Sequence, residues 1–235
     1  MTDEKEDSSS ALMKMVEAIA ITPKDARELV TQYEAQVRQA KPKATDAQLQ
    51  TLVTDKIIAR YSKMAATSGG ATSLAGVIPG IGTAIAAIGG GLADVSLCMK
   101  LQIDMTMCLG IAINKKMTNE DAKHMSFVIA LSGSLEQMAT KSASNVASKA
   151  AVKVVGEYLK GATLQTIKQL FKQVGINFTK AAASKAIPFG IGVVIGTTAN
   201  YALTRYVGSV ARDVFQLHVD GGDEEPETAV DALPN

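Results

Sequence analysis

Residues 64–93 read MAATSGGATSLAGVIPGIGTAIAAIGGGLA, and the interpretation of the whole chain depends on them. This stretch holds thirty residues without one charge, it is crowded with glycine, and its single proline is Pro79. Thirty uncharged residues are long enough to cross a bilayer, but a segment so rich in glycine and broken by proline is a poor simple spanning helix. The functional question is therefore whether this stretch packs against lipid or against protein.

A weaker copy of the pattern lies near the C-terminus. VIPGIG at 77–82 is echoed by AIPFGIG at 186–192, which opens an uncharged run over 186–204. Pro79, followed by Gly80, divides the first run into arms of 15 and 14 residues, 64–78 and 80–93. Each arm is roughly 20 Å long as a helix and shorter than a hydrocarbon layer of roughly 30 Å. The sequence predicts two glycine- and proline-rich apolar helical hairpins, with Pro79 and Pro188 each at a helix break or start.

The glycines of these runs recur at small-xxx-small spacings. Such a face drives helix association in lipid, and in water it lets two apolar hairpins nest, so both environments stay open. The residues predicted to serve hairpin packing or membrane contact are Gly76, Pro79, Gly80, Gly82, Gly89, Gly90, Gly91, Pro188, Gly190, Gly192 and Gly196.

Composition and periodicity predict an all-α protein. Hydrophobic residues make up 47% of the chain but aromatic residues only 4%, without any tryptophan, so small aliphatic side chains must build a closely packed core. Helix-start signals such as Thr22-Pro23 and Thr45-Asp46 precede segments of helical period, and no stretch alternates with period two for long. We expect a disordered N-terminus over 1–10, one helical domain over 11–219 and a disordered acidic tail over 220–235.

The net charge of +1 hides a segregation of charge along the chain. Residues 141–219 carry ten bases and only Glu157 and Asp213 as acids, whereas six acids and no base follow from Asp220 onward. This pattern indicates either an anionic partner or a tail that folds back to screen the basic region.

Three lysines of the basic region, Lys149, Lys153 and Lys160, fall on one side of a predicted helix, with valine and leucine roughly opposite, and later lysines extend the charge. A basic amphipathic stretch beside an uncharged run suits an anionic membrane surface, and a solvated helix face is an equally weighted alternative. Nucleic acid is disfavoured because arginine is scarce here and no aromatic residues interleave with the lysines. The residues predicted to bind an anionic surface are Lys149, Lys153, Lys160, Lys168 and Lys172.

The apolar helix predicted over 94–114 contains three charged residues, Asp94, Lys100 and Asp104. Lys100 and Asp104 are four residues apart and can pair, and Asp94 opens the helix. Such groups often mark function in membranes, but the interpretation we favour is a helix with one polar face. Asp94, Lys100, Asp104 and Asn200 are the candidates for buried polar residues.

Signals for catalysis or metal binding are missing from the sequence. The two histidines, His124 and His218, lie in unrelated contexts, and Cys98 and Cys108 are too far apart along one helix to bridge. There is no Cys/His cluster with metal spacing and no Gly-x-Ser-x-Gly. We therefore predict no catalytic residues, no metal, no cofactor and a non-enzymatic role.

Two segments resemble the EcsC family of bacterial proteins. They are GGATSLAGVIPGIGTAIAAIGGGLADVSLCMKLQIDMTMCLGIAI at 69–113 and IPFGIGVVIGTTANYALTRYVGSVARDVF at 187–215, in which Asn200, Arg205 and Arg212 occupy matching positions. Membrane-associated domains of some bacterial GTPases look similar, although this chain has no GTPase motif. The resemblance implies an all-α bacterial protein that is membrane-associated, and it supplies no reaction.

These observations together predict a non-enzymatic protein that is peripheral to the membrane or inserts conditionally through its hairpins. Its expected partners are anionic membrane lipid or a membrane protein, with a homo-oligomer as a further option. The N-terminal MTDEKEDSSS lacks the basic start and apolar stretch of a secretory signal, so we expect a cytoplasmic location at or in the inner membrane. The alternative is a soluble helical adaptor or regulatory protein-interaction module.

Overall fold

The computed structural model describes residues 12–67, 90–140, 148–160, 163–183 and 197–220. Within these ranges every regular element is a helix and no strand occurs, which confirms the all-α class. The predicted hairpin centres at Pro79 and Pro188 and the predicted disordered N-terminus lie outside the described residues. Of the predicted disordered tail, Asp220 is the last residue of α9, and the rest lies outside the described residues.

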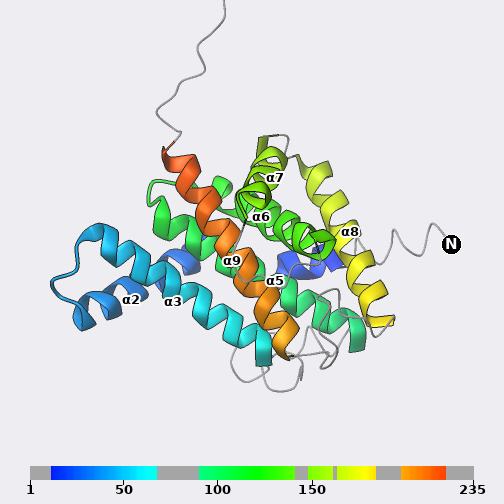
Figure 1. Ribbon diagram of the computed structural model, residues 1–235, viewed down its shortest axis with the longest axis horizontal. Helices are drawn as coiled ribbons and strands as arrows, with labels where there is room; N and C mark the ends of the chain where they lie inside the picture. The colour runs from blue at the N-terminus through cyan, green and yellow to red at the C-terminus, as the bar shows by residue number, and fades with distance from the viewer. Residues whose placement is uncertain (1–11, 68–89, 141–147, 161–162, 184–196, 221–235) are drawn as a thin grey trace, which may run out of the picture.

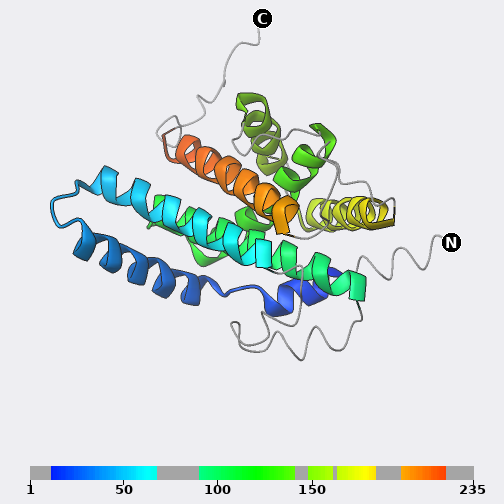
Figure 2. The same ribbon diagram turned by 60° about the horizontal axis from the view of Figure 1, so that its bottom comes forward.

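The chain enters the described region through a short helix over 12–19, followed by α2 (Pro23–Ala40) and α3 (Asp46–Thr67). Thr22 caps α2 by accepting a hydrogen bond from the Asp25 backbone N–H at 3.2 Å, with Pro23 at the first helical position. Thr45 and Gln48 form a reciprocal capping box at the start of α3. The two helices form an antiparallel hairpin whose turn lies at the left edge of Figures 1 and 2.

The centre of the fold is α5 (Gly90–Ile113), which packs against α2, α3, α6 and α9. Every side chain described in it, from Ser96 to Ile113, is buried. A helix that is apolar on all sides is expected to lie in the middle of a core, which is where α5 lies. The helix begins four residues before Asp94, the start predicted from the sequence.

Four described helices follow α5 along the chain, and α6, α8 and α9 of these contact it. Thr118 caps α6 (Asn119–Thr140), α7 (Lys149–Lys160) and α8 (Leu164–Ala183) pack against α6, and α9 (Thr197–Asp220) crosses α3 and α5 (Figure 1). Phe127 of α6 meets Phe171 of α8 with ring centroids 6.0 Å apart. One hydrophobic core therefore joins the helices that come before and after the uncharged runs.

Two glycines allow α9 to approach its neighbours closely. A Cβ atom on Gly110 would lie 2.7 Å from the ring of Phe215, and one on Gly208 would lie 2.9 Å from Ile58. Small residues at helix crossings do build this fold, as the composition suggests. The described crossings use Gly110 and Gly208, however, which the sequence analysis did not select.

The ends of the helices that border the two glycine-rich runs lie on one side of the molecule. The chain leaves α3 at Thr67 and enters α5 at Gly90, and it leaves α8 at Ala183 and enters α9 at Thr197. All four points lie toward the lower right of Figure 1, and they stay grouped in the second view. The C-terminal end of α9 and the whole of α7 lie toward the opposite side.

Candidate functional site

The predicted lysine face exists on α7. Lys149, Lys153 and Lys160 are exposed, while Val152 and Val155 on the other side of the helix are buried. Lys160 pairs with Glu157 at 3.1 Å. Among the residues that the structure describes, Lys149 and Lys153 have no ion-pair partner, so α7 presents two uncompensated positive charges.

The other two candidate lysines do not join this face. Lys168 is exposed and Lys172 is half-buried, and both lie on α8, a separate helix that packs against α6. The sequence placed these lysines in one charged stretch because they are near in number. The five lysines therefore belong to two different helices, three to α7 and two to α8.

Exposed apolar side chains gather near the basic helix. Of the six large hydrophobic residues that are exposed in the described ranges, five lie on α7, at the start of α8 or near the end of α9, and only Leu52 lies on α3. Leu164 is 59% exposed and Leu217 is 61% exposed, in a set that comprises Val154, Tyr158, Leu164, Leu217 and Val219. Exposed apolar residues grouped with lysines are typical of a surface that meets a partner or a lipid interface.

A groove of about 630 Å³ runs between α7 and the last turns of α9. All three lysines of α7 line it, together with Gly156 and with Gln216 and Leu217 of α9. Glu157 and Asp213 also line it. Sequence reasoning missed this groove because helices more than fifty residues apart in the chain form its two walls.

The ion pair between Lys100 and Asp104 is buried in the centre of the molecule. The side chains are 5% and 4% exposed, and Asp104 also accepts a hydrogen bond from the backbone N–H of Ile21 at 2.8 Å. Burial raises the pKa of Asp104, while the charge of Lys100 and the N–H of Ile21 oppose that rise. The two polar side chains share one side of α5, but that side is buried like the rest of the helix from Ser96 onward and does not face solvent.

Two further polar contacts join α5 to neighbouring helices, one to α3 and one to α6. The hydroxyl of Tyr61 lies 3.8 Å from the sulfur of Cys108, and Ser134 of α6 donates a hydrogen bond to Gln102 at 2.7 Å. Burial raises the pKa of Cys108 to about 12, so its thiol stays protonated near neutral pH. A buried, protonated thiol is a poor nucleophile. The two contacts therefore serve packing between helices.

Of the remaining predicted site residues, some lie in described helices and the others lie outside the described residues. Asn200 is half-buried in the first turn of α9. Gly90 and Gly91 belong to the first turn of α5, and the side chain of Asp94 is not described. The other predicted glycines and both prolines lie outside the described residues, namely Gly76, Pro79, Gly80, Gly82, Gly89, Pro188, Gly190, Gly192 and Gly196.

Two arginines that sequence reasoning gave little weight fasten helices together. Arg27 of α2 donates hydrogen bonds to the carbonyl oxygens of Lys115 and Met117, between α5 and α6. Arg212 of α9 pairs with Asp55 of α3 at 3.0 Å. Arg205, the other arginine that carries the resemblance, is exposed. Only the tertiary contacts reveal the positioning role of Arg27 and Arg212.

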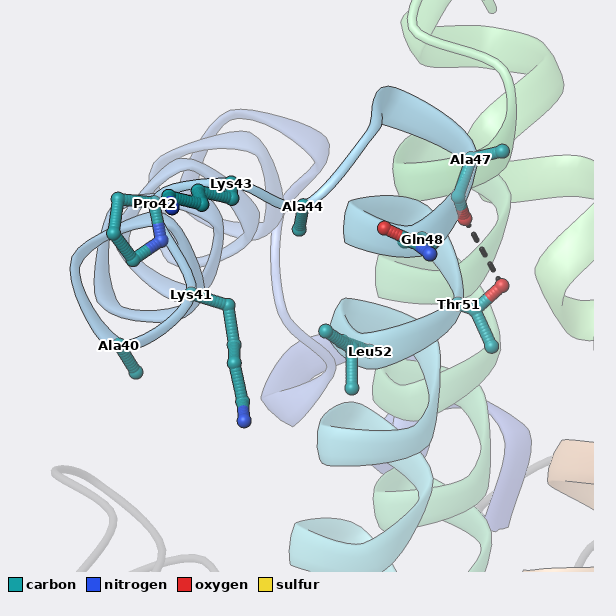
Figure 3. A pocket seen from close by; sticks show the side chains of 9 residues that line it. All are labelled: Ala40, Lys41, Pro42, Lys43, Ala44, Ala47, Gln48, Thr51 and Leu52. Atoms are coloured by element: carbon teal, nitrogen blue, oxygen red, sulfur yellow. Dashed lines mark hydrogen bonds between the residues drawn. The ribbon is translucent and has the colours of Figure 1, made fainter.

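A separate apolar groove of about 770 Å³ lies at the turn between α2 and α3. Lys41 extends from the end of α2 and Leu52 from the facing side of α3, so the two side chains border the gap in Figure 3. Leu52 is 39% exposed. This groove is the only described surface with an exposed large hydrophobic residue away from α7, α8 and α9.

The described residues contain no candidate metal site and one helix segment that is long and apolar enough to cross a membrane. No group of three or more His, Cys, Asp or Glu side chains that could hold a metal ion occurs among them. One helix segment, Ser96–Ile113, is long and apolar enough to cross a membrane, and all of it is buried inside the protein. A buried core helix meets the same criterion, so this segment alone assigns no membrane role.

The fold and the site define a class: an all-helical protein with a buried apolar central helix and a basic amphipathic helix on its outside. The model of the EcsC protein family matches residues 5–219, and the chain belongs to this family. The comparisons with curated proteins and with solved structures returned no match.

Proposed function

We propose that this protein is a non-enzymatic, membrane-associated helical protein of the cytoplasmic side that meets the bilayer through its two glycine-rich segments. One observation carries the proposal: the four helix ends that border these segments lie on one side of the helical body. Segments that leave the body from one side can enter one leaflet together, without any displacement of the core.

The composition of the two segments supports contact with lipid. The runs over 64–93 and 186–204 carry no charge, so neither contains a group with a large desolvation penalty. Their arms are too short to span a bilayer as single helices, which favours peripheral contact or conditional, partial insertion. Anionic lipid or a membrane protein would be the partner.

The position of α7 narrows this proposal. Helix α7 lies toward the side opposite the four helix ends (Figure 1), so a flat membrane that touches those helix ends would not also cover α7. The lysine face and the glycine-rich segments are thus competing candidates for the membrane contact, although they are near in sequence. We place the contact on the side of the four helix ends, because the helix ends that border both repeats lie there.

An environment-sensitive fluorophore would distinguish the two surfaces. A cysteine at Thr83, within the first glycine-rich segment, or at Val154, on the exposed face of α7, would carry the probe, since Cys98 and Cys108 are buried. Each labelled protein would be mixed with anionic and with neutral vesicles. The proposal predicts a blue shift at position 83 and none at position 154.

The other outcomes have defined meanings. A blue shift only at position 154, only with anionic vesicles and weakened by salt, would move the contact to the α7 lysines and contradict our placement. No shift at either position would favour the alternative, a soluble helical adaptor. The groove at the α2–α3 turn, with Leu52 exposed beside Lys41, is the observation that supports that alternative.

A further inference from the structure

The groove between α7 and α9 carries positive charge that the described residues do not neutralise. Its two carboxylates are already paired, Glu157 with Lys160 at 3.1 Å and Asp213 with Arg212 at 3.5 Å. Lys149 and Lys153 line the same groove without an ion-pair partner in the part of the chain that the structure describes. The groove therefore suits an anionic occupant.

Part of the wall of this groove is also apolar. Leu217 of α9 lines it and is 61% exposed, and the buried Val152 lines it on the α7 side. Gly156 lies on the α7 side, where a Cβ atom would meet nothing within 4 Å. An extended chain that carries both carboxylates and small apolar side chains would match this combination of charge, apolar surface and free space.

The chain itself supplies a segment of that chemistry at that place. α9 ends at Asp220, three residues after Leu217, and residues 221–235 follow with five acids and no base. The same segment contains Val230 and Leu233. Fifteen extended residues span about 50 Å, whereas the twelve residues of α7 form a helix about 18 Å long. The segment can therefore reach every lysine of the groove.

We propose that the acidic segment 221–235 occupies the α7–α9 groove of its own chain, with carboxylates on Lys149 and Lys153. Individual exposed ion pairs are weak and are screened by salt. A tethered segment, however, is present at an effective concentration on the order of millimolar, which suffices to fill a weak site. The contact would be reversible, salt-dependent and open to displacement by another polyanion.

Zero-length crosslinking of carboxylates to amines tests this contact in the full-length protein. We expect amide crosslinks from Lys149 and Lys153 to acids between Asp223 and Asp231 at low salt, identified by mass spectrometry. The crosslinks should fall severalfold in high salt. The double variant Lys149→Gln/Lys153→Gln should lose them, while the matched variant Lys24→Gln/Lys123→Gln, at two exposed lysines on α2 and α6, should keep them.

Two results would overturn the proposal. Crosslinks spread over exposed lysines in general would show that the segment has no preferred site. Crosslinks found only between differently isotope-labelled chains in a mixed sample would place the segment on a second copy. The proposal makes no use of a membrane, so a failure of the vesicle experiment leaves it standing, and a negative crosslinking result leaves the vesicle experiment unaffected.

Discussion

Helices α5 and α7 carry the same pairing chemistry in opposite surroundings. Lys100 and Asp104 lie one turn apart in α5 with side chains 5% and 4% exposed, whereas Glu157 and Lys160 lie one turn apart in α7 with side chains 59% and 76% exposed. A buried charge that loses its partner cannot recover hydration, while an exposed one can. Sequence spacing therefore identifies an ion pair, but burial determines how much stability is lost when one of its partners is removed.

The largest expected effect comes from removal of one member of the buried pair. Lys100→Met leaves the carboxylate of Asp104 buried without its partner, which should reduce the free energy of unfolding by about 3–5 kcal/mol. Urea denaturation followed by circular dichroism would measure the change. The double variant Lys100→Met/Asp104→Asn should recover most of it, because asparagine is neutral and still accepts the hydrogen bond from Ile21. A single variant as stable as wild type would show that the pair is hydrated.

Alkaline pH should weaken the protein through Cys108, on the same buried helix. Its pKa is raised from 9.0 to about 12 by burial, so between those values the unfolded thiol loses its proton while the folded thiol keeps it. The unfolded state is therefore favoured as pH rises, and the free energy of unfolding should fall by up to a few kcal/mol. Denaturation curves from pH 8 to 11 would record this fall. A Cys108→Ala variant should show a shallower one, and an unchanged slope would contradict the assignment.

Gly110 in α5 and Gly156 in α7 allow the packing of the buried and the exposed helix to be compared. Gly110→Ala places a Cβ atom against the buried ring of Phe215, at 2.7 Å before any adjustment, and should destabilise by about 1–3 kcal/mol. Gly156→Ala in α7 meets open space and should stabilise by roughly 0.5–1 kcal/mol, because alanine is the better helix former. Thermal midpoints should move in opposite directions. Shifts of the same sign would mean that α5 and α9 do not cross as closely as described.

The smallest effect is expected at the exposed pair. Lys160→Ala removes a pair that solvent already screens, so the free energy of unfolding should change by no more than about 0.5 kcal/mol. Urea denaturation at low and high salt would measure both values, and the difference from wild type should shrink as salt rises. A loss comparable with that of Lys100→Met would erase the contrast between the two helices.

Much of the local structure was predictable because it depends on neighbours in sequence. The helix starts at Thr22 and Thr118 need only a hydroxyl three residues before a backbone N–H. The buried side of α7, with Val152 and Val155, follows from helical period alone. The start of α5 was placed four residues too late because glycine is a weak helix former, and packing against other helices overrode that preference.

The candidate site was predictable only in its parts. The sequence identified Lys149, Lys153 and Lys160 as one helical face, but it joined them to Lys168 and Lys172, which belong to α8. It also set the lysines beside the glycine-rich run, whereas the fold carries α7 toward the opposite side. Distance along the chain and distance in space differ here because α8, which follows α7, leads along the right side of Figure 1 from near α7 toward the side of the four helix ends.

The sequence by itself determined the all-α class, the starts of the capped helices, the family and the separation of basic from acidic segments. These properties depend on residue type and on spacings of a few residues, which act before any tertiary contact forms. Only the tertiary structure decided that Lys100 and Asp104 are fully buried, that Gly110 faces Phe215, and that a groove separates α7 from α9. Each of these depends on which helices, distant in the sequence, pack together. The spacing of apolar residues within a helix shows which side is buried but does not show which other helix covers it.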